Sequence, residues 1–364
     1  MNRDSVGPRR DFLAALVAAG TAAAAAVPSR RAAAEETADF PIPTLDPARV
    51  VRRTAGLRPY REGGIRIEAE TIGEKNVVHC YGHGGAGVTL SWGSAEMAAD
   101  LVSASGTAAR APVVVLGCGA VGLAAARVLL ERGHPVRVLA RDFPPGTTSN
   151  LSGAMWLPVS VDPGSDRARF RKLAADSWRR FAALAANPES GVVRRPLYET
   201  EGVPAAEADL PAEMLATKSA LARLPFAGLA PQPGRRWETF LVEPPVYLPW
   251  LVREALRAGA VLAEKTFGSP ADLAGLPEKA IVNCLGLGAG EVFSDTAVLP
   301  IRGQLVYLFP EPLPYLVTHR GGYCFPRGDA VVLGGTFERG VADETPDPAA
   351  CERILASHRR FFSS

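Results

Sequence analysis

The chain has 364 residues, 47% of them hydrophobic and 21% charged, which allows two domains and excludes a disordered or fibrous protein. Its net charge of +2 becomes −1 without residues 1–34, which hold five arginines and two aspartates. This balance predicts neither a nucleic-acid partner nor an anionic-membrane partner. The five cysteines form no C-x-x-C pair and the five histidines show no ligand spacing, so no metal site is expected.

The first 34 residues have the features of an export signal. Arg9-Arg10 is followed by an apolar run of Ala, Leu and Val, and Ala32-Ala33-Ala34 fits a small-residue cleavage site. The run is too short for a membrane span. We therefore expect a twin-arginine (Tat) signal over residues 1–34 and export to the periplasm or beyond the cell. A disordered Ala-rich leader is the alternative.

The next predicted elements form a βαβ unit that is preceded by a separate group of strands. Residues 35–47 contain proline and acidic residues and are predicted to be a linker. Strand-like segments start at Val50, a helix is expected over Ser94–Val102, and residues 103–112 fit a flexible connector. The βαβ unit has a buried strand at Val113–Leu116, a glycine turn, a helix at Leu123–Glu131 and a strand at Pro135–Ala140.

The second half of the chain is predicted to hold helices first and then strands. Residues 165–225 are expected to be mainly helical from their Ala, Leu and Arg periodicity, and another helix is expected over Tyr247–Ala258. The predicted strands lie at Ala280–Cys284, Gly303–Leu308, Tyr315–Thr318 and Ala330–Gly335. Together with the βαβ unit, these elements indicate an α/β protein.

The glycine turn carries the first functional signal. Its pattern G-x-G-x-x-G follows a buried strand and opens a helix, which is the context that predicts dinucleotide binding. Gly117 permits the tight turn, Gly119 lets the backbone approach a pyrophosphate, and Gly122 allows close helix–sheet packing. The helix start at Ala120 and Val121 offers free N–H groups to phosphates. The alternative is a purely structural glycine-rich turn.

An acidic residue stands at the end of the second predicted strand, where dinucleotide folds bind ribose. Asp142, beside Arg141, can accept hydrogen bonds from both ribose hydroxyls of an adenosine, which points away from NADP. A solvated surface pair is the alternative.

The same stretch resembles the start of the D-amino-acid oxidase family. The resemblance rests on Val113–Gly122, Ala140-Arg141-Asp142, Thr147-Thr148-Ser149 and Gly153-Ala154-Met155-Trp156. In that family this stretch wraps the adenosine and pyrophosphate of FAD, which implies FAD as the cofactor. The residues implied to contact it are Gly117, Gly119, Ala120, Val121, Gly122, Arg141, Asp142, Thr147, Thr148, Ser149, Gly153 and Ala154.

Other segments continue the resemblance. Ala280–Gly290 resembles a strand that approaches the dinucleotide again, and Ile301-Arg302-Gly303-Gln304 resembles the R-G-Q motif after it. Asn76–Gly93 resembles the closing, flavin-contacting segment of the family. It implies backbone N–H groups at the isoalloxazine edge, where donors stabilise negative charge on the reduced flavin. These groups belong to Gly84, Gly85, Gly87, Val88 and Thr89, whereas His83 is expected to be structural.

The order of these segments implies a circular permutation. The closing segment precedes the glycine turn here, whereas in the family it follows that turn by a long stretch. Cys351–Phe362 resembles the helix that ordinarily precedes the stretch matched by Ala48–Val51. The old ends would then be joined through Ser103–Pro112, a flexible connector that costs little closure entropy if those ends are near.

Three residues are implied to hold the substrate. Gly56-Leu57-Arg58-Pro59 resembles the family motif whose arginine grips the substrate carboxylate, for which a planar guanidinium is suited. Tyr323 resembles a tyrosine that contacts the same carboxylate, and Gly85 a glycine whose carbonyl accepts from the substrate amine. A surface Arg58 in a salt bridge and a packed strand tyrosine are the alternatives. Residues 319–323 replace a longer lid that carries a second tyrosine in eukaryotic members.

The resemblance predicts an FAD-binding Rossmann-type domain combined with a mixed-sheet substrate-binding domain. The expected division is signal 1–34, linker 35–47, FAD-binding 48–160, substrate 161–275, FAD-binding return 276–300 and substrate 301–364. The expected reaction is oxidation of a D-amino acid to a 2-oxo acid, with ammonia and hydrogen peroxide formed from water and oxygen. An FAD-dependent amine or glycine oxidase, a flavin dehydrogenase, and a non-catalytic exported flavin-fold protein are the alternatives.

Overall fold

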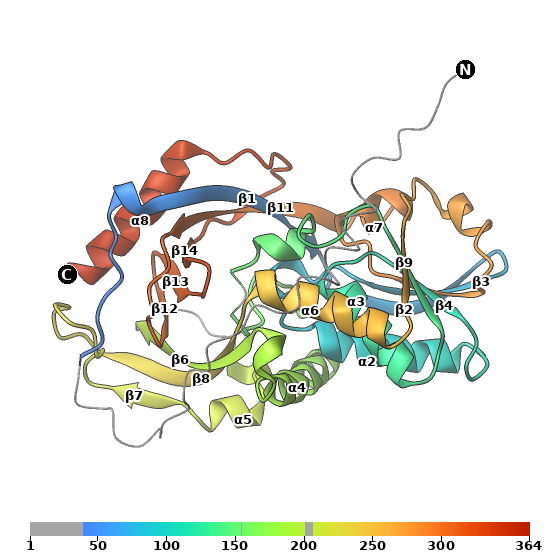
Figure 1. Ribbon diagram of the computed structural model, residues 1–364, viewed down its shortest axis with the longest axis horizontal. Coiled ribbons are helices and arrows are strands. Elements are labelled where there is room, and N and C mark those ends of the chain that lie inside the picture. Colours follow the sequence, from blue (N-terminus) through green and yellow to red (C-terminus); the bar gives the residue numbers. More distant parts are fainter. Residues whose placement is uncertain (1–38, 154, 201–206) are drawn as a thin grey trace. The chain divides into compact units, whose positions relative to one another are not determined.

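Two mixed sheets organise the part of the chain that a computed structural model describes, which comprises residues 39–153, 155–200 and 207–364 (Figure 1). The predicted signal at residues 1–34 and the predicted cofactor contact Ala154 lie outside this part. Residues 40–364 form one unit by their contacts. The two mixed sheets confirm the predicted α/β class.

The smaller sheet has the strand order β2, β3, β10, β4, β5, β9. Its strands are β2 (Arg66–Ile72), β3 (Lys75–Tyr81), β4 (Val113–Leu116), β5 (Val136–Ala140), β9 (Val261–Glu264) and β10 (Ala280–Asn283). All neighbours run parallel except β2, which pairs antiparallel with β3 at the edge. The central strands β4 and β10 are buried along their whole length, as expected for strands that are covered on both faces.

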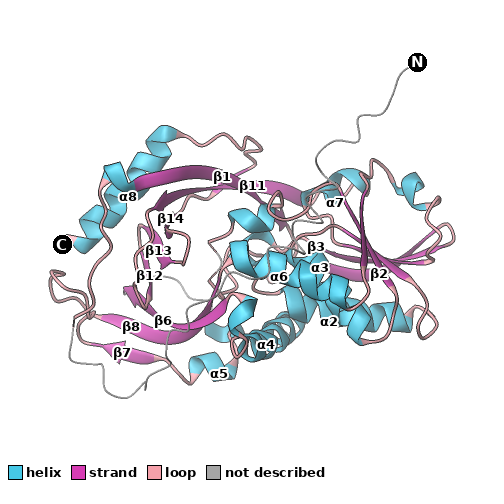
Figure 2. Ribbon diagram, viewed as in Figure 1, coloured by secondary structure: helices cyan, strands magenta, loops and turns pink. Residues whose placement is uncertain are grey.

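Helices cover one face of this sheet. The helices of the described residues are α2 (Ser91–Ala104), α3 (Ala120–Glu131), α4 (Arg167–Leu184), α5 (Ala212–Leu215), α6 (Pro244–Arg257), α7 (Leu287–Val292) and α8 (Pro348–Phe362). Helix α3 packs between α2 and α6, and Figure 2 shows the three grouped together. Val113 and Val115 of β4 face this helical side, while Val114 and Leu116 pack on the other side, near α7. None of the described helices is long and apolar enough to cross a membrane.

The larger sheet has the order β1, β11, β14, β13, β12, β6, β8, β7, and β15 pairs with β11. Its strands are β1 (Val50–Arg61), β6 (Val192–Thr200), β7 (Ser219–Leu221), β8 (Gly234–Val242), β11 (Val298–Leu308), β12 (Leu316–His319), β13 (Gly322–Pro326), β14 (Val331–Gly334) and β15 (Glu338–Arg339). Only β6 and β12 run parallel, so this sheet is also mixed. Figure 1 shows β1 and β11 side by side, although they are far apart in the sequence.

The two ends of the described chain meet on one hydrophobic cluster. Phe40 pairs with the turn near Phe226, and the Ser364 carbonyl accepts a hydrogen bond from Ala230 in the same turn at 2.7 Å. The side chain of Phe40 packs on the cluster that also contains Ile354 of α8. The beginning of the described chain therefore lies beside its C-terminal helix.

Several predicted elements need correction. Residues 165–225 are helical mainly over α4, whereas 192–200 form β6, whose pairing with β8 and β12 overrides the local helical preference. Helix α2 extends three residues before the predicted start and two beyond the predicted end, so the connector begins at Ser105. Strand β1 lies in the larger sheet and β9 in the smaller one, in contrast to the predicted domain boundaries. The predicted strands at 113–116 and 280–284 are present within one residue.

Candidate active site

A cavity of about 1500 Å³ opens at the carboxyl ends of the parallel strands, where ligands bind in open α/β sheets. The residues that directly follow β3, β4, β5, β9 and β10 all line it: Gly82, Gly117, Arg141, Lys265 and Cys284. From there the cavity continues to the larger sheet, where Gly303 and Tyr323 line it. One space thus joins both sheets.

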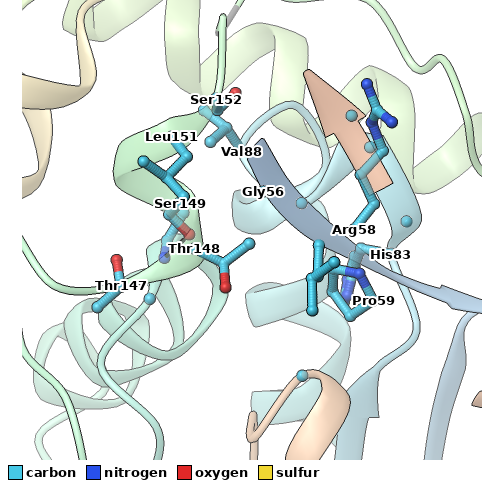
Figure 3. A pocket seen from close by; sticks show the side chains of 18 of the residues that line it. Gly56, Arg58, Pro59, His83, Val88, Thr147, Thr148, Ser149, Leu151 and Ser152 are labelled. Atoms are coloured by element: carbon cyan, nitrogen blue, oxygen red, sulfur yellow. Dashed lines mark hydrogen bonds between the residues drawn. The ribbon is translucent and has the colours of Figure 1, made fainter. Parts of the chain in front are cut away.

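Every predicted site residue of the described chain lines this cavity. They are Arg58, Gly84, Gly85, Gly87, Val88, Thr89, Gly117, Gly119, Ala120, Val121, Gly122, Arg141, Asp142, Thr147, Thr148, Ser149, Gly153 and Tyr323. Figure 3 shows the segment that contains Thr147 and Ser149 on one side of the space, with Arg58, Pro59 and His83 on the other. The structure brings these positions together, and their individual roles remain predictions.

The glycine turn is packed so closely that two of its glycines have no room for a side chain. Gly117 has a φ of 104°, and an added Cβ would lie 2.5 Å from the carbonyl oxygen of Cys284. A Cβ at Gly122 would overlap the carbonyl of Gly117 itself. Gly119 differs, because its Cβ would meet only the Ser149 hydroxyl, at 3.1 Å. The turn therefore brings bare backbone to the cavity wall.

The N-terminus of α3 faces the cavity beside this turn. Ala120, Val121 and Gly122 of its first turn all line the cavity, and the capping residue Gly119 has no side chain. The Ser149 hydroxyl accepts the Ala120 N–H at 3.0 Å, so this N–H is not free as the sequence led us to expect, and the bond holds the neighbouring 3-10 turn against the helix. First-turn N–H groups and the positive end of a helix dipole stabilise phosphate groups. This wall fits the pyrophosphate of a dinucleotide.

Asp142 lies at the cavity edge directly after β5. Its carboxylate accepts a hydrogen bond from Arg141 Nε at 2.7 Å. The side chains of Arg141 and Asp142 are 75% and 46% exposed. The pair is therefore solvated, which agrees with the alternative of a surface pair. It also borders the cavity directly after β5, where dinucleotide-binding folds contact ribose.

The loop between β3 and α2 forms another wall of the cavity. A Cβ at Gly84, whose φ is 54°, would overlap the Ser160 carbonyl. The Gly85 N–H donates to that carbonyl at 2.8 Å, so this group is not free for the isoalloxazine edge. Val88 and Thr89 line the cavity, and their N–H groups have no hydrogen-bond partner among the described residues. They stand just before α2, where the helix dipole also favours negative charge.

Arg58 and Tyr323 lie together over glycines of the larger sheet. A Cβ at Gly303 of β11 would overlap the Arg58 guanidinium, and one at Gly334 of β14 would overlap the Tyr323 ring. Arg58 Nη1 donates to the Thr336 carbonyl at 3.1 Å. Its positive charge also lies near enough to Tyr323 to act on the pKa of the phenol. These glycines therefore leave room for two polar groups on a crowded sheet face.

The electrostatics of this pair favour an anionic ligand. Arg58 is half-buried and forms no ion pair with any residue in the described ranges. Burial raises the pKa of Tyr323, although nearby Arg58 opposes this effect, so the phenol stays protonated and can donate. A guanidinium fork and a phenolic donor together bind a carboxylate well. Within the described residues, Arg58 therefore does not form the surface salt bridge that the alternative predicted.

Several residues of the cavity were not predicted from the sequence. Glu199 of β6 and Thr318 of β12 line its far end, and Lys265 and Phe267 line it beyond β9. The positions after β9 could have been found as the carboxyl end of a parallel strand. Glu199 gave no such signal, because its segment was predicted to be helical. Phe337 also lines the cavity, with 55% of its surface exposed.

The sequence is similar to that of known oxidases. The family model described as FAD dependent oxidoreductase matches residues 5–101 and 112–364. The D-amino-acid oxidase of Rubrobacter xylanophilus is 35% identical over 254 residues, which cover 67% of this chain and 75% of that protein. The D-amino-acid oxidase of Streptomyces coelicolor is 31% identical over 250 residues, with the same coverage of both chains.

Solved structures share the fold. A glycine oxidase from Geobacillus kaustophilus has a TM-score of 0.53 at 20% identity, over 69% of this chain and 78% of that one. An iminodiacetate oxidase from Chelativorans has a TM-score of 0.53 at 17% identity, over 68% of this chain and 78% of that one. The bare glycine turn, the α3 N-terminus and the free N–H groups before α2 fit the FAD that the description of the family names. The chain belongs to the family of FAD-dependent oxidoreductases, and its cofactor is FAD.

Proposed function

We propose that this enzyme oxidises D-amino acids to 2-oxo acids. The balanced reaction consumes oxygen and water and releases ammonia and hydrogen peroxide. The observation that carries the proposal is the half-buried Arg58, which lacks an acidic partner in the described chain and lies beside the protonated Tyr323 in the FAD cavity. The two D-amino-acid oxidases that match the chain support the same substrate class.

The chain's own groups orient the substrate and supply electrostatic stabilisation. Arg58 and Tyr323 would bind the substrate carboxylate, and the Gly85 carbonyl would accept from the amine. FAD, held at the glycine turn and the α3 N-terminus, would supply the two-electron oxidation at the substrate Cα and the transfer of those electrons to oxygen. The Val88 and Thr89 N–H groups and the α2 N-terminus would stabilise the negative charge that develops beside them. His83 is held by Ser94 at 2.9 Å and serves the structure.

The experiment is a spectrum of the purified yellow protein under anaerobic conditions. A mixture of D-amino acids should bleach the flavin absorbance, whereas the L-enantiomers should not, because fixed carboxylate and amine contacts leave one enantiomer with Cα–H facing the acceptor. Bleaching by glycine or sarcosine alone would favour the amine-oxidase alternative, to which the structural neighbours belong. Bleaching by D-amino acids without oxygen uptake in air would favour a dehydrogenase.

We also propose that the chain is circularly permuted relative to its family. Strand β3 precedes the glycine turn in sequence and lies in the same sheet as β4, parallel to its neighbour β10. The family model matches two segments, with residues 102–111 between them. Phe40 and Ser364 both hydrogen-bond to the turn at residues 225–230, so the ends are near enough for a short connection.

A reordered chain tests the permutation. It would begin at Ala111, join Ser364 to Phe40 by a short Gly/Ser linker and end at Ser105, which keeps the hydrogen bonds of His134 to Ala111 and of Asn76 to Ser105. We expect FAD affinity within about tenfold of the unreordered chain, because loop closure changes the free energy little. The proposal is contradicted if the reordered chain binds no FAD while a chain of residues 40–364 in the native order binds it.

We propose further that residues 1–34 direct export by the Tat route, which carries folded proteins and so suits an enzyme loaded with its cofactor before transport. The proposal rests on Arg9-Arg10, the apolar run and Ala32-Ala33-Ala34 in the sequence. Replacing both arginines with lysine should retain the protein in the cytoplasm, as cell fractionation would measure. Unchanged export of that variant contradicts the proposal.

A further inference from the structure

We propose that Glu199 and Thr318 form the binding site for the substrate side chain, and that the preferred substrates are D-amino acids with a basic side chain. The inference rests on the proposed D-amino-acid oxidation and names the substrate class of that site. Its basis is a row of side chains that crosses the larger sheet, from the expected carboxylate contact to a buried acid.

The row follows directly from the strand register. Tyr323 of β13 pairs with Thr318 of β12, and Thr318 pairs with Glu199 of β6. Side chains of paired residues lie on the same face of a sheet, and all three line the cavity. Two strand spacings separate Tyr323 from Glu199, or roughly 10 Å between Cβ atoms. The cavity therefore extends from the expected carboxylate contact across two more strands.

The far end of this row presents hydrogen-bond acceptors. Thr318 Oγ1 donates its hydrogen to Glu199 Oε1 at 3.0 Å, which leaves the threonine oxygen with lone pairs only. Trp237 Nε1 donates to Glu199 Oε2 at 2.6 Å, so Oε1 keeps capacity for one more donor. A side chain that ends in an N–H donor suits these acceptors, whereas an apolar end leaves them unpaired.

Glu199 is a buried acid, with 1% of its surface exposed. Burial raises its pKa above the ordinary glutamate range, so a bound ammonium or guanidinium group would stabilise its ionised form. Its cationic neighbour Arg235 lies 3.6 Å from Oε2, and Arg235 also pairs with Glu207 at 2.9 Å. Arg235 is thus shared between two acids.

Two other residues at this end of the cavity contribute little charge. Burial lowers the pKa of His319 to about 3, so this side chain is neutral near pH 7. Arg320 is exposed at the turn between β12 and β13, where solvent and salt screen its charge. Glu199 is therefore the buried acid of this row, two strands from Tyr323. An extended lysine side chain reaches roughly 6 Å beyond Cα, and a hydrogen bond of about 3 Å to Glu199 brings the span close to the length of the row.

The test compares D-lysine with D-norleucine, which has nearly the same shape but lacks the ammonium group, on the FAD-loaded enzyme. We expect kcat/KM for D-lysine to exceed that for D-norleucine about 10- to 100-fold, as for a hydrogen bond to a charged group. Glu199→Gln should reduce this ratio at least about tenfold. The matched control Glu213→Gln removes an exposed acid that lies outside the cavity, and it should leave the ratio unchanged.

Binding of unreactive ligands gives a readout that does not depend on oxidation. By calorimetry, 6-aminohexanoate should bind more tightly than hexanoate, and Glu199→Gln should remove the difference. Equal ratios in the native enzyme and Glu199→Gln overturn this inference, and D-norleucine turnover would then show that the oxidase activity stands. If neither amino acid is oxidised, but 6-aminohexanoate still binds more tightly than hexanoate and Glu199→Gln removes this difference, the oxidase proposal fails while the cation-binding site at Glu199 is confirmed.

Discussion

Replacing Gly119 with valine should abolish FAD binding while the fold persists. Gly119 has φ −79° and ψ −175°, an extended conformation that valine adopts readily. Its Cβ would meet only the Ser149 hydroxyl, at 3.1 Å, and a side chain can rotate away. The added methyl groups would instead occupy the space before the α3 N-terminus, where the pyrophosphate must approach the backbone.

The measurement is FAD affinity by equilibrium dialysis, together with circular dichroism and the melting temperature of the cofactor-free protein. We expect affinity to fall by about 100-fold or more, with the spectrum of the cofactor-free fold unchanged. Gly275→Val is the matched control, because an added Cβ there has no neighbour within 4 Å and Gly275 is not a cavity residue. A Gly119→Val protein that remains yellow after purification and dialysis would show that the pyrophosphate does not lie at this turn.

The same substitution at the other two glycines of the turn would not separate cofactor binding from folding. Side chains at Gly117 or Gly122 would meet backbone atoms of Cys284 or of Gly117 itself, so the turn would be displaced with or without FAD. This distinction could not be drawn from the sequence. The motif predicts three glycines, but the constraint on Gly117 depends on Cys284, which follows a strand far away in the chain.

What the sequence could predict was mostly local. The runs Val113–Leu116 and Ala280–Asn283 are continuous and apolar, and a strand buried on both faces requires that pattern. The glycine turn directly follows one of these strands, so the part of the cavity that binds the FAD pyrophosphate could be predicted from the sequence. The loop before α2 could be placed only through its resemblance to the family.

What the sequence could not predict depends on long-range pairing. Residues 192–200 include two adjacent arginines and a proline, and only pairing with β8 and β12 makes them a strand. Glu199 reaches the cavity through that pairing alone. The Gly85 N–H was likewise assigned to the flavin, because nothing local indicates that the Ser160 carbonyl accepts it.

Replacing Arg58 with leucine should remove most activity without affecting FAD binding. Its guanidinium lies over Gly303, apart from the glycine turn, and it has no acidic partner in the described part of the chain. The variant would leave a substrate carboxylate without its cation, at a cost of about 3–5 kcal/mol in the transition state, or roughly 10²–10⁴-fold in kcat/KM. Arg58→Lys should restore only part of this, since an ammonium cannot make the bidentate contact.

Two further variants distinguish the effect of displacing the Arg58 charge from the effect of removing it. Gly303→Ala should displace the guanidinium and reproduce part of the loss while the charge is kept, because the added Cβ would overlap it. Arg53→Leu, at an exposed position on the same strand β1, should leave kcat/KM unchanged. Steady-state oxygen uptake with a D-amino acid measures all four enzymes against the parent. If Arg58→Leu turns over D-amino acids as fast as the parent, or if L-amino acids react equally well, Arg58 does not bind the carboxylate, and the substrate assignment fails although the FAD-dependent fold stands.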